Sequence, residues 1–166
     1  TTLCRAVLHR RKIFRSLFIM DRLSSTYLGR PMTISEEDWD DVFSFENIKD
    51  FQHRLLEVCK LSGKVLSNVY YNPSISLKLA LKLAVELKSQ SLENPIKPPT
   101  PENYARPVDH RYFLPHICHL HSIILLSRPF FHFIVLHKLG FVTYDQSSKN
   151  YIHLRNFYQS CVKSSL

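Results

Sequence analysis

Residues 2–31, TLCRAVLHRRKIFRSLFIMDRLSSTYLGRP, decide the fold class of this chain. Their large apolar side chains recur every three or four positions, as they do on one face of an α-helix. This spacing predicts a helix over residues 2–28. Gly29, Arg30 and Pro31 would end it, because glycine caps helices and proline cannot continue one. The predicted apolar face consists of Leu3, Val7, Phe14, Leu17 and Leu28, with Ile13 and Met20 beside them.

The same helical spacing continues along the rest of the chain. It predicts helices over about residues 47–71, 74–91 and 109–127, a further helical stretch from a bend at Arg128-Pro129 to Gly140, and a last helix from about Tyr151. Asn47 and Asp109 are candidate N-caps. Five prolines fall within residues 92–107, which are therefore expected to form a long internal loop.

The composition agrees with an all-α domain. Of the 166 residues 45% are apolar and 22% are charged, which is ordinary for a folded domain and excludes a disordered tail. Only three glycines are present, so a phosphate-binding loop and a dinucleotide fingerprint are excluded. We therefore expect an irregular multi-helix bundle in which residues 1–166 are part of one domain.

The four cysteines, Cys4, Cys59, Cys118 and Cys161, are widely spaced. This spacing argues against a zinc finger, a redox pair and a compact disulfide framework. Free thiols in a core are typical of proteins of the cytosol or nucleus, where the environment is reducing.

The formal net charge of +8 is unevenly distributed. Residues 1–30 hold seven bases and one acid, and residues 35–50 hold seven acids and one base, so these two blocks cancel. The excess arises in residues 51–166, mostly from scattered lysines, which are typical of a solvated surface. No basic stripe with interleaved aromatic residues is present, so the sequence does not favour a nucleic-acid groove in this chain.

The segment Tyr112–His137 is apolar enough to raise the question of a membrane span. Arg128, Pro115, Pro129 and five histidines interrupt it. The pattern therefore favours a pair of buried helices, and we expect no membrane partner.

A local cluster of His116, Cys118, His119 and His121 is the one candidate for metal chemistry. His116 and His119 would share one helix face, and two imidazoles can begin a zinc site. No second Cys/His cluster completes such a site, and no serine lies in a nucleophile elbow. We predict no catalytic residue, no metal site and no enzyme activity; a metal-dependent helical enzyme using His116 and His119 is the least favoured alternative.

Asp21 and Arg22 are charged residues without an opposite charge three or four positions away. Asp21 lies on the apolar stripe of the first helix, where an unpaired carboxylate would be costly. We hypothesise that Asp21 or Arg22 locks this helix to a distant element, with Arg128 as the candidate partner of Asp21. The alternative is that Asp21 is exposed to solvent.

Two motifs resemble a known family. The run from Arg10 to Arg22 leads through Leu28-Gly29-Arg30-Pro31 to the acidic Asp38-Trp39-Asp40, and a later aliphatic stretch closes in Arg128-Pro129-Phe130. Together they resemble the fungal-specific transcription factor domain, the middle homology region of fungal zinc-binuclear-cluster regulators. Residues 51–71 resemble the family's next helix, Cys161 matches a frequent cysteine, and residues 74–107 match only in character.

The resemblance implies an all-helical regulatory domain of a nuclear transcription factor that controls RNA polymerase II transcription. This chain would be the C-terminal portion of that domain. Promoter DNA would be bound by a zinc cluster outside this chain, so zinc is expected in the parent protein and no cofactor in this chain. Its partners would be co-regulator proteins or the remainder of the domain, with apolar surface exposed along the first helix where that remainder packs.

A second hypothesis is a small-molecule-sensing domain on the same scaffold. Its pocket would be lined by Tyr112, Phe113, Phe130, Phe131 and Phe133. Aromatic residues at helical spacing also serve as core, so the sequence leaves both roles open for them.

Overall fold

Within residues 2–35, 50–72, 74–93 and 110–166, which the computed structural model describes, the chain forms five α-helices and one short π-helix and no strand. The helices are α1 (Thr2–Leu28), α2 (Asp50–Val65) with its π-helical continuation η2 (Leu66–Tyr70), α3 (Leu77–Glu93), α4 (His110–Lys138) and α5 (Lys149–Ser165). The all-α fold predicted from the sequence is confirmed. The candidate caps Asn47 and Asp109, the acidic Asp38-Trp39-Asp40 and most of the proline-rich loop lie outside the described residues.

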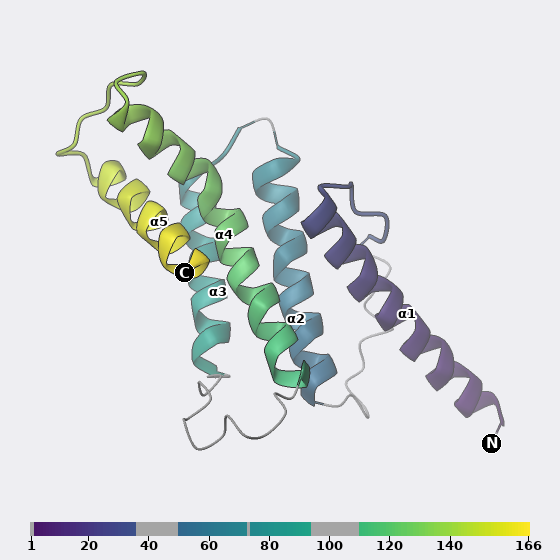
Figure 1. Cartoon of the computed structure of the whole chain (residues 1–166). Helices are drawn as coiled ribbons and strands as arrows, with labels where there is room; N and C mark the ends of the chain where they lie inside the picture. Colours follow the sequence, from purple (N-terminus) through teal and green to yellow (C-terminus); the bar gives the residue numbers. More distant parts are fainter. Residues whose placement is uncertain (1, 36–49, 73, 94–109) are drawn as a thin grey trace, which may run out of the picture.

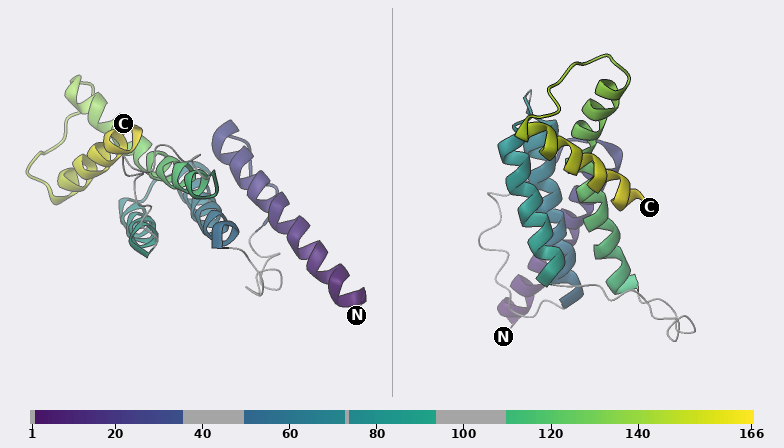
Figure 2. Two further views of the ribbon diagram at one scale, coloured as in Figure 1. Left: turned by 60° about the horizontal axis from the view of Figure 1, so that its bottom comes forward. Right: turned by 90° about the vertical axis from the view of Figure 1, so that its left-hand side faces the viewer.

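Helices α2, α3 and α4 form the centre of the molecule, with α1 on one flank and α5 on the other (Figures 1 and 2). Helix α1 packs on α2, whereas α5 packs along α4. The N-terminal half of α1 extends away from the other helices (Figure 1), and most of its side chains before residue 14 are exposed.

Two apolar clusters hold these helices together. The larger joins α2, η2, α3, α4 and α5, and its most buried members include Val65, Ala80, Leu87, Leu126, Ile134 and Phe157. The smaller joins α1 to α2 and α4 through Phe18, Leu55, Leu56, Val58, Cys59 and Cys118. Between α2 and α4, the hydroxyl oxygens of Ser62 and Ser122 are 2.6 Å apart and buried, so small side chains let these two helices approach closely.

The buried face of α1 differs from the one predicted. Phe18, Arg22 and Ser25 are buried against α2 and α4, whereas Leu17 and Leu28 are more than half exposed. The prediction was wrong because its apolar stripe omitted Phe18, which is fully buried, and left arginine and serine outside; of its members, Phe14 does pack against the smaller cluster. In α1, polar side chains with hydrogen-bond partners take the core positions instead.

Helix α4 runs without a break through Pro129, where the sequence predicted a bend between two helices. A proline has no N–H to bond the carbonyl four residues earlier, which is that of Leu125. The hydroxyl of Tyr70 in η2 donates to this carbonyl oxygen at 2.9 Å. The helix continues because a side chain from a neighbouring helix satisfies the acceptor that the proline leaves unbonded.

Helix α4 is also the one helix in the described part of the chain that is long and apolar enough to cross a membrane, over Phe113–Lys138. Length and composition alone support this, and the core helix of a helical domain has the same properties. Here α4 contacts α2, α3 and α5 and contributes Leu125, Leu126 and Phe130 to the main cluster. Its position is that of a core helix.

Candidate functional site: the α1 clamp and the outer stripe

Arg22 is the centre of a polar cluster at the C-terminal end of α1. Its side chain is only 1% exposed, and its Nη1 donates to Oδ2 of Asp21 at 2.7 Å. Its Nη2 donates to the carbonyl oxygen of Ile34 at 2.8 Å, and its guanidinium lies 4.2 Å from the ring centroid of Phe18. A buried guanidinium needs such partners, because desolvating an unpaired charge is costly.

Asp21 connects this cluster to the segment that follows the helix. Its carboxylate oxygens accept from the backbone N–H of Thr33 at 3.1 Å and from that of Ile34 at 3.3 Å. One carboxylate therefore receives the arginine and two backbone donors. We call the contacts of Asp21 and Arg22 with Thr33 and Ile34 the α1 clamp.

The residues after α1 turn the chain back toward Asp21. Gly29 has φ +66°, a left-handed conformation that closes the helix and that glycine adopts without strain. The carbonyl of Arg30 accepts from the hydroxyl of Tyr71 at 3.0 Å, and that of Pro31 accepts from Ser25 at 3.4 Å. The Leu-Gly-Arg-Pro motif thus brings residues 33 and 34 within reach of the acidic end of the clamp.

The predicted Asp21–Arg128 pair is wrong. Asp21 pairs with the adjacent Arg22, and Arg128 lies exposed on α4 without an ion pair to it. Burial is the main cause of the shifted pKa values of Tyr70, His121 and Cys161, and the positive charge of Arg128 lowers each of these pKa values. The hydrogen bonds of Asp21 and Arg22 reach Thr33 and Ile34, just after the helix, and not the distant element that the sequence suggested.

The outward side of α1 carries an uncovered apolar surface. Ile13, Leu17, Met20 and Leu28 are 48–64% exposed and lie on one helix face, opposite Phe18 and Arg22. We call these four residues the outer stripe. Contiguous apolar surface of this kind marks an interaction site more often than isolated apolar residues do.

Three of the five aromatic residues predicted to line a pocket pack against other aromatic rings, whereas Phe113 is exposed. Phe130 stacks on Phe157 with centroids 4.5 Å apart, Phe131 stacks on Tyr158 at 5.2 Å, and Phe133 meets Tyr144 edge-on at 5.6 Å. Phe113 is 54% exposed, and the side chain of Tyr112 lies outside the described residues. Phe130, Phe131 and Phe133 thus make the contacts of α4 with α5 and the loop before it.

The histidines of the 116–121 cluster point to different neighbours. His121 stacks on Tyr27 of α1 with centroids 4.4 Å apart, whereas His119 faces α3 and α5. Burial lowers the pKa of both imidazoles, and the neighbouring His116 adds to this for His119. Among the residues that the structure describes, no group of three His, Cys, Asp or Glu side chains could hold a metal ion.

Three cysteines, Cys59, Cys118 and Cys161, are buried free thiols. Burial raises the pKa of all three, and that of Cys59 reaches about 12. The thiolate is the reactive form of cysteine, so at neutral pH these side chains are protonated and poor nucleophiles. They serve as apolar filling between α1, α2, α4 and α5.

The comparisons with known proteins agree with a regulatory protein. The chain is 36% identical over 151 residues to Filamentous growth regulator 27 of Candida albicans, a match that covers 80% of this chain and 19% of that protein. The chain thus spans about a fifth of the length of this curated relative. No protein-family model matches the chain. No solved structure matches it either.

Proposed function

We propose that this chain is a regulatory and interaction domain of a nuclear transcription factor that controls RNA polymerase II transcription. The observation that carries the proposal is the 36% identity, over four-fifths of this chain, to a protein named as a filamentous growth regulator. The clamp supports it, because Asp21, Arg22 and the Leu-Gly-Arg-Pro turn form one structural unit from the residues of the family motif. Promoter DNA would be bound by a zinc cluster elsewhere in the parent protein.

Within this function, the outer stripe is the docking surface for another helix of the same regulator. The relative supports this assignment, because the match occupies 19% of its length and about four-fifths of that protein lies outside it. Arg10 is exposed one turn before Ile13 on the same face. We therefore expect the docking helix to carry an apolar face and an acidic residue opposite Arg10.

We further propose that the chain acts without a catalytic step, a cofactor or a membrane of its own. The buried cysteines are protonated, and His121 is stacked against Tyr27. Helix α4 fits the role of a core helix that fixes the remaining elements.

The proposal is tested in the organism, on the full gene product. We expect the tagged protein to enter the nucleus and to associate with promoters, and deletion of its gene to change transcription from those promoters. A gene product that carries no DNA-binding module and is absent from chromatin would overturn the proposal.

The role of the outer stripe is tested by Leu17→Glu with Met20→Glu in the same full-length protein. Both side chains are more than half exposed, so the variant should fold but lose the docked helix. We expect promoter occupancy to persist while transcriptional control changes. Limited proteolysis should then cut the released segment faster.

Val85→Glu is the matched control, because Val85 is 68% exposed on α3, away from the stripe. It should leave transcription and proteolysis unchanged. If the double variant behaves like this control, the stripe is not a docking surface. If a separate co-regulator, and not a helix of the same chain, dissociates from the variant, the intramolecular assignment is wrong.

A further inference from the structure

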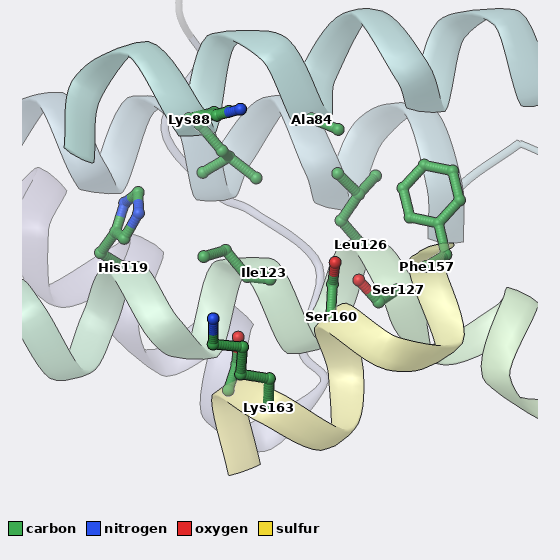
Figure 3. Close-up of a pocket in the computed structure, with 11 residues that line it drawn as sticks. Ala84, Lys88, His119, Ile123, Leu126, Ser127, Phe157, Ser160 and Lys163 are labelled. Carbon is green, nitrogen blue, oxygen red and sulfur yellow. The ribbon is translucent and has the colours of Figure 1, made fainter. Parts of the chain in front are cut away.

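A pocket of about 330 Å³ lies between α3, α4 and α5, on the far side of α4 from α1 (Figure 3). From α4 it is lined by His119, Ile123 and Ser127, which are spaced by four residues and share one face. At 1.5 Å per residue, these positions span about 12 Å along the helix. A volume of this size suits a small organic molecule.

The inner wall of this pocket is apolar. Leu87 of α3, Leu126 of α4 and Phe157 of α5 are buried side chains that line it. We call these three residues the apolar floor. An apolar ligand body placed on the floor would leave water at the pocket and gain free energy from burial.

The charged groups of the pocket are both positive. Lys88 comes from α3 and Lys163 from α5, and none of the described residues that line the pocket is acidic. Neither ammonium group forms an ion pair within the described ranges, whereas Lys60 and Lys64 pair with glutamates at 3.0 Å. Two cations without a counter-charge favour an anion between them.

His119 supplies a polar atom that lacks a partner. The side chain is 8% exposed, and within the described part of the chain its Nε2 has no hydrogen-bond partner. Figure 3 shows its imidazole between α4 and α3, at one end of the pocket. Because burial lowers its pKa, the ring is neutral at pH 7 and can donate one hydrogen bond from Nε2 to a ligand oxygen. A buried polar atom without a partner is costly, and a ligand oxygen would remove that cost.

We propose that this pocket binds a small organic monocarboxylate. The carboxylate lies between the ammonium groups of Lys88 and Lys163 and accepts from His119, and the apolar part of the ligand rests on the floor. This inference goes beyond the proposed function and does not depend on it, because binding is measured on the purified protein without any promoter.

Octanoate is the probe, since it combines one carboxylate with a short apolar chain. We expect saturable binding by isothermal titration calorimetry and a rise in melting temperature with octanoate concentration. 1-Octanol carries the same apolar chain without the charge, and acetate carries the charge without the chain. Both should bind at least about tenfold more weakly than octanoate, because each lacks one of the two interactions.

The variant Lys88→Gln with Lys163→Gln removes both charges from the exposed rim. We expect it to weaken octanoate binding by about tenfold or more, because charge-assisted hydrogen bonds are lost. The matched control is Lys78→Gln with Lys149→Gln, which removes two exposed lysines from the same two helices outside the pocket. It should leave the affinity unchanged.

Four results would overturn the proposal. Three of them are the absence of saturable octanoate binding, equal binding by the pocket variant and the wild type, and equal binding of octanoate and 1-octanol. The fourth is an equal loss in the pocket variant and the control, because the lysines would then act only through the net charge. None of these results bears on promoter association, so the two proposals can fail separately.

Discussion

The α1 clamp and the pocket between α3, α4 and α5 are both polar clusters in an otherwise apolar interior, but their groups are satisfied differently. In the clamp, the guanidinium of Arg22 has a carboxylate, a carbonyl oxygen and an aromatic ring as partners, all from α1 and the residues just after it. In the pocket, Lys88 and Lys163 have no carboxylate partner among the described residues, and Nε2 of His119 is unbonded there. The difference separates a polar cluster that stabilises the fold from one suited to a ligand. Removing a clamp group should cost stability, whereas removing a pocket group should not.

The largest effect is expected from Arg22→Met. The substitution keeps an apolar stem but leaves the carboxylate of Asp21 without its cation, which in buried pairs costs about 3–5 kcal/mol of folding free energy. Urea denaturation of the purified chain measures this loss. Arg30→Met is the control, because Arg30 is exposed, and it should change the free energy of unfolding by less than about 0.5 kcal/mol. Equal losses in the two variants would contradict the structural role of the clamp.

A smaller effect of opposite sign is expected from His119→Leu. An apolar side chain removes the unbonded Nε2, so the free energy of unfolding should rise by about 1 kcal/mol. His132→Leu, at an exposed position of the same helix, should change it little. A loss of stability in His119→Leu would show that the imidazole is bonded in solution.

The same histidine gives the protein an acid-sensitive stability. Burial lowers the pKa of His119 and His121, so below about pH 6.5 the unfolded chain binds more protons than the folded chain. The free energy of unfolding should therefore fall as the pH is lowered from 7.5 to 5.5. Denaturation curves at several pH values measure this slope, and His119→Leu should make it shallower. An unchanged slope in the variant would show that other groups cause the acid sensitivity.

The smallest effect on stability is expected from the pocket lysines. Lys88→Gln with Lys163→Gln removes two exposed charges without ion pairs in the described part of the chain, so the free energy of unfolding should change by less than about 0.5 kcal/mol. Thermal and urea denaturation without ligand check this. A loss above about 1 kcal/mol would place the lysines with the clamp as structural groups.

The sequence predicted where the helices lie along the chain better than which of their faces are buried. Residues 2–28 were predicted as one helix, and the structure has α1 at Thr2–Leu28. Which face of α1 is buried could not be read from apolar spacing, because Arg22 and Ser25 are buried through hydrogen bonds to residues 31–34. The sequence also could not show that α4 continues through Pro129, because this depends on a hydrogen bond from Tyr70, 59 positions earlier in the sequence.

The sequence predicted the residues of the clamp but not those of the pocket, for a similar reason. The motif residues Asp21, Arg22 and Gly29 do lie together, because they are close in sequence and the turn after α1 is short. Lys88, His119 and Lys163 come from three helices, and their lysines were taken for ordinary solvated surface. Only the packing of α3 and α5 on α4 brings these side chains to one pocket.

The hydroxyl of Tyr70 has a mechanical consequence. A helix interrupted by a proline can bend at that position, and here the hydrogen bond from Tyr70 to the carbonyl of Leu125 fixes the helix from outside. The adjacent Tyr71 bonds the carbonyl of Arg30 after α1. Tyr70 and Tyr71, at the end of η2, thus connect this helix to α4 near Pro129 and to the turn after α1. A displacement of α1 can therefore change the bend of α4 at Pro129 through the hydrogen bonds of Tyr71 and Tyr70.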